Sequence, residues 1–220
     1  KVYAVLSHVL TPDSTLLDIG AGPGSITIPF AQHIKCVTAI EPSKGMGAVL
    51  KENAKELGVE NFNIIEEMVQ DLPQDGSLDS QFDVVAISLV LWMFPDVWPR
   101  ILQMEQYSKS YCAIVAGIPN WKNPRAASKS DVEEFQILYN MLLSQGRFPN
   151  VSVIDYKCER MVEDEIECRK IIYEQYEGDL TSEAEEQIRT EVITRAKDNK
   201  CLISSRSAVI WWSPRETVSP

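Results

Sequence analysis

Residues 15–31 read TLLDIGAGPGSITIPFA, and this stretch decides the fold class. The apolar run Thr15–Ile19 predicts a buried strand, and the pattern after the turn predicts a helix over Gly24–His33. Alternate glycines stand between the two elements, where glycine allows positive φ and a close approach of the backbone to a ligand. A strand, a glycine turn and a helix in this order are typical of an α/β fold.

The following residues, up to about position 117, repeat this alternation of apolar runs and helical periodicities. Because strands that alternate with helices are joined by right-handed crossovers, the pattern predicts a parallel sheet with helices on both faces. The further predicted strands are Lys35–Ile40, Phe62–Ile65, Phe82–Leu89 and Tyr111–Gly117, and the helices are Ser43–Leu57 and 96–107.

After Gly117 the pattern changes to longer helices. We expect a single domain over residues 1–220, with a helical insertion at 159–200 that is either a solvated helix pair or a lid. The predicted fold class is α/β and doubly wound, with a mostly parallel seven-stranded sheet and a final antiparallel strand. The elements predicted here are helix Ser130–Ser144, strand Val151–Tyr156, helix Glu163–Tyr176, helix Ser182–Ala196 with a Ser182–Glu185 capping box, and strand Leu202–Trp212.

Composition limits the classes of function. The 220 residues hold 21 Lys and Arg against 32 Asp and Glu, a net charge of −11, which disfavours nucleic acid as a partner because such binding depends on phosphate neutralisation. Five Cys without a C-x-x-C pair and only two His predict no metal site and a reducing, cytoplasmic location. No apolar run approaches the roughly 20 residues that span a membrane, so we expect no membrane association.

The glycine turn and a later acid predict a nucleoside cofactor. Glu41 follows the second strand, 21 residues after Gly20, where a carboxylate can accept hydrogen bonds from ribose hydroxyls. A dinucleotide fingerprint would need Gly at position 25, which is Ser25, and Asp18 would repel a pyrophosphate but not a cationic sulfonium. The alternative is that Asp18 and the glycines only form a tight turn.

The motifs LLDIGAGPGSITIPFA and VTAIEPSKGM resemble the class I S-adenosylmethionine-dependent methyltransferase family over Leu16–Gly117. The resemblance implies S-adenosyl-L-methionine as cofactor and methyl transfer as activity. It also implies roles for individual residues. Asp18, Gly20, Gly22 and Gly24 would surround the methionine moiety, Glu41 would hold the ribose hydroxyls, Pro42 would pack on adenine, and Met46 and Ser88 would complete the pocket.

One position departs from the family pattern. The family commonly has G-D-A-x-x-L-P after strand three, with the Asp bound to the adenine amino group, whereas this chain has Met68 at the Asp position. Adenine would therefore be held by packing and by the backbone near Val69. Glu67 and Asp71 are alternatives that the alignment does not place.

The acceptor is expected beyond the carboxyl ends of strands four and five. Trp92, Phe94 and Trp121 would form an aromatic wall there, with ordinary core or loop packing as the alternative. The catalytic residues stay unknown, since His8 is only a candidate base and Asp96 is either a substrate contact or a helix cap.

We thus expect methyl transfer to a small-molecule acceptor. The alternatives are a non-catalytic S-adenosylmethionine-binding module and, less favoured, an NAD-dependent oxidoreductase. Trp211 and Trp212 on the last strand suggest a homodimer surface, although alternating strand faces place one of them in the core.

Overall fold

The computed structural model describes residues 1–72, 76–79, 81–118, 129–176 and 178–214. The chain divides into two compact units, each of which draws on separate stretches of sequence. The first is Lys1–Ala116, Glu134–Ile154 and Ala208–Pro220, and the second is Gly117–Glu133 and Asp155–Ser207.

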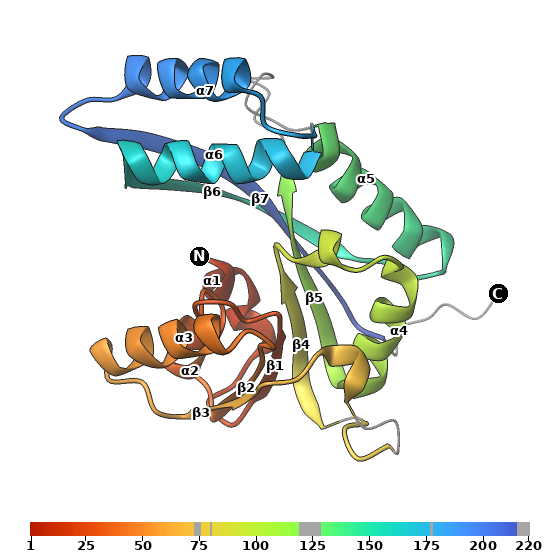
Figure 1. Cartoon of the computed structure of the whole chain (residues 1–220). Coiled ribbons are helices and arrows are strands. Elements are labelled where there is room, and N and C mark those ends of the chain that lie inside the picture. Colours follow the sequence, from red (N-terminus) through yellow and green to blue (C-terminus); the bar gives the residue numbers. More distant parts are fainter. Residues whose placement is uncertain (73–75, 80, 119–128, 177, 215–220) are drawn as a thin grey trace. The chain divides into compact units, whose positions relative to one another are not determined.

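In the described part of the chain, seven strands form one sheet in the order β3-β2-β1-β4-β5-β7-β6. The pairs β1–β2, β2–β3, β1–β4 and β4–β5 are parallel, and β7 is the antiparallel strand of this mixed sheet (Figure 1). The predicted fold class is therefore confirmed. The strands are β1 (Thr15–Ile19), β2 (Cys36–Ile40), β3 (Phe62–Ile65), β4 (Phe82–Ser88), β5 (Ser108–Ile118), β6 (Asn150–Met161) and β7 (Lys200–Trp212).

Helices connect these strands as the alternating pattern predicted. In the first unit, α3 and α4 lie on opposite sides of the parallel strands (Figure 1). The helices are α1 (Val2–Leu6), η1 (Ser7–Val9), α2 (Thr27–Ala31), α3 (Lys44–Glu56), η2 (Val69–Asp71), η3 (Leu91–Met93), α4 (Val97–Tyr107), α5 (Lys129–Ser144), α6 (Val162–Tyr176) and α7 (Ser182–Arg195). Among the described residues, no helix combines the length and apolar character needed to cross a membrane.

A row of isoleucines crosses five parallel strands near the carboxyl ends of β1, β2, β3 and β4. Ile19 of β1 pairs with Ile40 of β2 and Ile87 of β4, and the row continues to Ile65 of β3 and Ile114 of β5. Because the register is shared, the loops that follow these strands leave the sheet at one edge. This edge is where ligands bind in open α/β sheets.

Several element bounds differ from the prediction. Helix α2 is shorter than predicted and begins at Thr27, because the glycine turn extends past Gly24, whose φ is +95°. Strand β5 begins at Ser108, directly after α4 and three residues before the predicted start at Tyr111. Strand β6 extends to Met161, five residues beyond the prediction.

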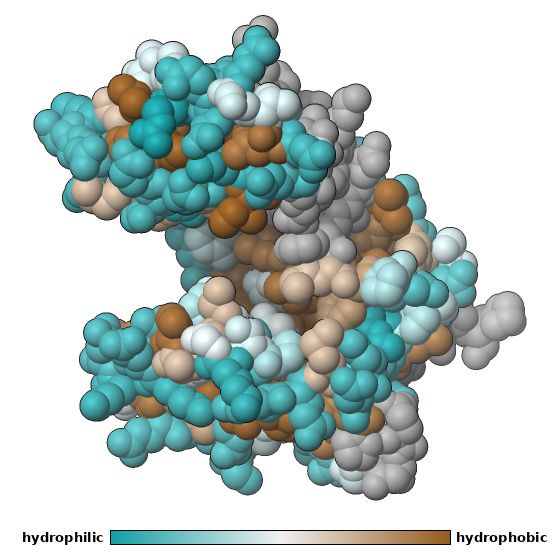
Figure 2. Space-filling view, in the orientation of Figure 1, coloured by the Kyte–Doolittle hydropathy of each residue, from teal (hydrophilic) through white to brown (hydrophobic). Residues whose placement is uncertain are grey.

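The predicted insertion at 159–200 lies in the second unit, where α6 and α7 pack on a small core of Val162, Ile166, Val192 and Cys201. The cap of α7 is Thr181, whose hydroxyl accepts the Ala184 N–H at 3.2 Å, so the predicted Ser182 cap is wrong by one residue. The visible surface of these helices is mainly hydrophilic (Figure 2). That surface fits the solvated-helix interpretation, whereas the lid role stays a prediction.

Candidate functional site

The glycine turn is held against the end of β2. The N–H groups of Gly20 and Ala21 both donate to the Ile40 carbonyl, at 2.9 and 3.1 Å. Gly20 has a φ of +74°, and a Cβ added there would lie 2.6 Å from Cγ2 of Val90. The position therefore requires glycine both for its conformation and for the close approach of the loop after β4.

The other two glycines have different surroundings. A Cβ added to Gly24 would lie 2.9 Å from Cδ1 of Ile28, so Gly24 allows α2 to pack closely on the turn. A Cβ added to Gly22 would meet nothing within 4 Å, and Gly22 is thus the glycine that leaves open space beside the turn.

Asp18 is buried at the end of β1 and connects this strand to α2. Its Oδ2 accepts hydrogen bonds from Thr27 N–H at 3.0 Å and from Thr27 Oγ1 at 2.7 Å. Its Oδ1 has no partner among the described residues. Burial, with a smaller effect of the nearby Glu41, raises the pKa of Asp18 to about 6 against the lowering effect of the two Thr27 hydrogen bonds.

Glu41 lies directly after β2, and both of its carboxylate oxygens face backbone donors. Oε2 accepts the Gly22 N–H at 2.8 Å and Oε1 accepts the Ser43 N–H at 2.8 Å. The side chain is thereby fixed at the start of α3, for which Ser43 is the N-cap. An ionised carboxylate has about four lone-pair sites, so each oxygen can accept one more hydrogen bond.

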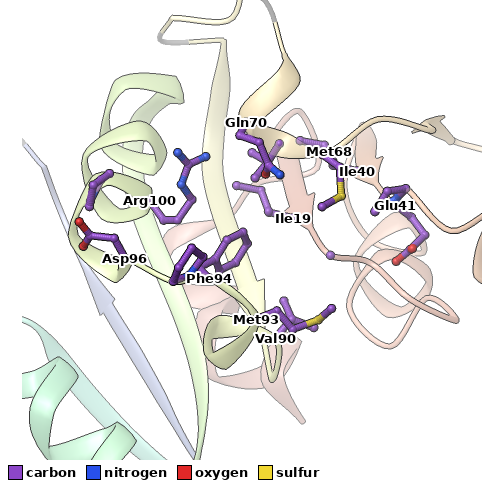
Figure 3. Close-up of a pocket in the computed structure, with 15 residues that line it drawn as sticks. Ile19, Ile40, Glu41, Met68, Gln70, Val90, Met93, Phe94, Asp96 and Arg100 are labelled. Atoms are coloured by element: carbon purple, nitrogen blue, oxygen red, sulfur yellow. The ribbon is translucent and has the colours of Figure 1, made fainter.

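A cavity of about 390 Å³ opens at this edge of the sheet. Its volume lies in the usual range of small-molecule sites. Figure 3 shows Glu41 at one side and Asp96 at the other, with Ile19, Met68 and Gln70 between them in this view. The lining residues, all in the first unit, are Ile19, Gly20, Ile40, Glu41, Pro42, Met68, Val69, Gln70, Val90, Met93, Phe94, Pro95, Asp96, Pro99 and Arg100.

Five of the ten predicted cofactor residues line this cavity, namely Gly20, Glu41, Pro42, Met68 and Val69. The other five are not in its lining. Asp18 and Gly24 lie beneath the turn, Gly22 and Met46 face open space or solvent, and Ser88 is the last residue of β4.

Of the three predicted aromatic residues, Phe94 lines the cavity. Trp92 belongs to η3, but its side chain lies outside the described residues, as does the whole of Trp121. Asp96 both lines the cavity and caps α4, because its Oδ1 accepts the Trp98 N–H at 3.2 Å.

Neither histidine lines the cavity. The Nδ1 atom of His8 lies 2.8 Å from the Val5 carbonyl oxygen, and its ring contacts Trp211 edge-on at 5.6 Å. His33 stacks on Tyr3 with ring centroids 4.2 Å apart. His8, the candidate base, is therefore not placed at this cavity in the structure.

The sequence did not predict that Pro99 and Arg100 of α4 line the cavity. Pro99 and Arg100 line the cavity, and the Arg100 guanidinium lies 6.0 Å from the Phe94 ring centroid and donates to Gln103. The buried Gln103 in turn donates to the Val69 carbonyl at 3.1 Å. Helical spacing of the polar residues 96, 100 and 103 places them near one face, and this pattern could have identified them.

Residues 16–105 match the family model described as a methyltransferase domain. The "uncharacterized methyltransferase YcgJ" of Bacillus subtilis is 28% identical over 94 residues, which cover 43% of this chain and 36% of that protein. The tRNA (cytosine(72)-C(5))-methyltransferase of Pyrococcus horikoshii is 30% identical over 99 residues, covering 43% of this chain and 25% of that protein.

Two solved structures share the fold. The crystal structure of Bacillus subtilis YcgJ has a TM-score of 0.61 at 16% identity and covers 98% of both chains. A SAM-dependent methyltransferase from Aquifex aeolicus has a TM-score of 0.54 at 18% identity, covering 70% of this chain and 82% of that one. The resemblance inferred from the motifs is thus confirmed: residues 16–105 match the methyltransferase domain model, and the chain shares its fold with YcgJ and with the SAM-dependent methyltransferase from Aquifex aeolicus.

Proposed function

We propose that this chain transfers the methyl group of S-adenosylmethionine to a small-molecule acceptor. The observation that carries the proposal is that Gly20 and Glu41, at the ends of β1 and β2, line one cavity within the matched methyltransferase segment. The cofactor, when bound, supplies an electrophilic methyl group on a sulfonium.

The residues around the turn fit this cofactor. Glu41 keeps one acceptor site free on each oxygen, which suits the two hydroxyls of a ribose. The unpartnered Oδ1 of Asp18 is a buried acceptor at the glycine turn, and the negative charge of the carboxylate favours a ligand that carries an ammonium and a sulfonium. Gly22 leaves room for the ligand to approach the turn.

The surface around the cavity favours an apolar acceptor of small size. Met46, Met68, Leu89 and Met93 follow the ends of β2, β3 and β4, and 45–62% of each residue is exposed. Among the described residues that line the cavity, Arg100 is the one cation, whereas nucleic-acid binding requires several phosphate contacts. Relatives are named as tRNA, 23S rRNA and cobalt-precorrin-6B methyltransferases, so the experiment below compares RNA with small-molecule acceptors.

In this proposal, holding the acceptor atom in line with the methyl group supplies much of the rate acceleration. Methyl transfer needs an in-line approach of the acceptor atom to about 3–3.5 Å, and a closed, apolar site supports it by excluding water.

We further propose that the helical segment 159–200 selects the acceptor, that the protein is cytoplasmic, and that Trp211 contributes to a homodimer. Trp212 is 1% exposed and belongs to the core, as expected for one of the two tryptophans.

A binding and turnover experiment tests the proposal. Calorimetric titration with S-adenosylhomocysteine, S-adenosylmethionine and NAD should give heat with the first two only, and binding of NAD alone would support an oxidoreductase. Methyl-labelled cofactor is then incubated with total RNA and, separately, with an RNA-free metabolite extract. Label in the metabolites supports the proposal, label in RNA overturns the small-molecule part, and binding without transfer to either supports a non-catalytic module.

A further inference from the structure

Gln70 lines the cavity together with Asp96 and Arg100, and the proposed function gives none of these three polar side chains a contact with the cofactor. Gln70 belongs to the short helix η2, after β3, two residues beyond the position where the family has its adenine-binding Asp and this chain has Met68. We propose that the Gln70 side-chain amide binds the hydrogen-bonding edge of the adenine. This inference rests on the proposed function, because it assumes that the ribose lies at Glu41.

The arrangement of the cavity places the base near Gln70. Glu41 lies at one side of the cavity, and Arg100 and Asp96 lie toward the opposite side, with Gln70 between them in the view of Figure 3. On this proposal, a nucleoside whose ribose contacts Glu41 extends its base into the cavity, where Gln70 is one of the lining side chains. Met68 and Phe94 supply apolar surface for the faces of the base in the same cavity.

The other polar residues at this side are less suited to adenine. The Oδ1 atom of Asp96 accepts the Trp98 N–H, and Asp96 offers acceptors only. Arg100 offers donors only, and it already donates to Gln103. Each hydrogen-bonding edge of adenine combines the 6-amino donor with a neighbouring ring acceptor, and the amide of Gln matches such a pair with one oxygen and one nitrogen.

The backbone that carries Gln70 is fixed by a buried contact. Gln103, which is 7% exposed, donates from Nε2 to the Val69 carbonyl at 3.1 Å and to the Tyr107 hydroxyl at 2.7 Å. Within η2, the Asp71 N–H donates to the Met68 carbonyl at 2.9 Å. A pre-organised turn lowers the entropy cost of ligand contacts, so Gln103 is a positioning residue for Gln70.

The test measures the contribution of the 6-amino group by calorimetry. The probes are S-adenosylhomocysteine and its 6-deamino purine analogue, which lacks only that amino group. The wild-type chain should bind the deamino analogue about tenfold more weakly, since one hydrogen bond is lost and its partner is left unpaired. Gln70→Leu should bind S-adenosylhomocysteine about tenfold more weakly and should no longer distinguish the two probes.

Two further variants make the result specific. Gln70→Glu keeps an acceptor for the 6-amino group and should still bind S-adenosylhomocysteine more tightly than the deamino analogue. Gln32→Leu is the control: it makes the same change as Gln70→Leu at an exposed residue of the first unit and should behave as wild type. An undiminished preference in Gln70→Leu would overturn the inference and point to the backbone near Val69. Failure of the wild-type chain to bind S-adenosylhomocysteine would instead remove the proposed function, and the base contact with it.

Discussion

The Oε2 atom of Glu41 accepts the backbone N–H of Gly22 at 2.8 Å, so the acid after β2 is bonded to the middle of the glycine turn after β1. The same carboxylate accepts the Ser43 N–H through Oε1 and thereby also contacts the start of α3. One side chain thus connects two loops at the ligand edge of the sheet while it keeps an acceptor site on each oxygen for a ligand.

Glu41→Gln tests this double role. The amide retains the size of the side chain but places an N–H group opposite one of the two backbone donors, and it removes the charge. We expect S-adenosylhomocysteine to bind about 10- to 100-fold more weakly by calorimetry, because hydrogen bonds to a charged group contribute about 1.5–3 kcal/mol. Glu66→Gln is the matched control, since Glu66 forms an exposed ion pair with Lys51, and it should leave affinity unchanged.

Gly20→Ala and Gly22→Ala should separate folding from binding. In Gly20→Ala the new Cβ would meet Val90 at 2.6 Å while the backbone keeps a positive φ, so we expect chemical denaturation to show a loss of about 2–3 kcal/mol. At Gly22 the space is open and the strain alone should cost about 1 kcal/mol, but the methyl group would occupy room needed by the cofactor.

Calorimetry distinguishes the two glycine variants further. Gly22→Ala should fold and lose most of its affinity for S-adenosylhomocysteine. Adding Val90→Ala to Gly20→Ala should restore part of the lost stability because it removes the clash. Equal stability of the two glycine variants would contradict the contact between Gly20 and Val90.

Asp18 should make the stability of the chain depend on pH. Its pKa is raised in the folded state from 3.8 to about 6, so its contribution is most favourable below pH 4 and is lost as the pH rises through 6. The buried charge then costs about 3 kcal/mol at pH 8, at 1.36 kcal/mol per pKa unit. Asp18→Asn should therefore raise the melting temperature at pH 8 and change it little near pH 4.

The same substitution should impair cofactor binding. The Asn side chain keeps an acceptor for Thr27 but lacks the negative charge that favours a cationic ligand. For the wild-type chain, affinity for S-adenosylmethionine should fall as the pH decreases below 6, and calorimetry should show this dependence absent in Asp18→Asn. An identical pH profile in both proteins would exclude the role of Asp18.

Glu105 should be essential for stability although it does not line the cavity. Its Oε1 accepts Trp212 Nε1 at 2.8 Å and its Oε2 forms an ion pair with Arg147 at 2.7 Å. Glu105→Leu leaves both donors without this partner, and we expect a loss of about 3–5 kcal/mol in urea denaturation. Binding of S-adenosylhomocysteine by the folded fraction should be unchanged, whereas Glu105→Gln should recover part of the stability.

Sequence patterns identified the parallel strands within a few residues because β1, β2, β4 and the centre of β5 are short, mostly apolar and largely buried. They located the glycine turn and Glu41 for the same reason, since both follow directly from strand ends. They did not find the contribution of α4. Helical spacing can show that residues 96, 100 and 103 share a face of α4, but it does not show which loop this face meets. Gln103 contacts the loop after β3 through its hydrogen bond to the Val69 carbonyl, across 34 positions of the chain.

The sequence by itself determined the order of strands and helices, the class of fold and the positions of the ligand-edge loops, because periodicity and glycine content are local properties. Only the tertiary structure decided which side chains share the cavity. It directs Asp18 toward Thr27 beneath the turn and lets Glu41 bridge two loops. It also brings Gln70 and α4 to the same cavity, because long-range packing of the sheet and its helices, rather than spacing along the chain, sets those distances.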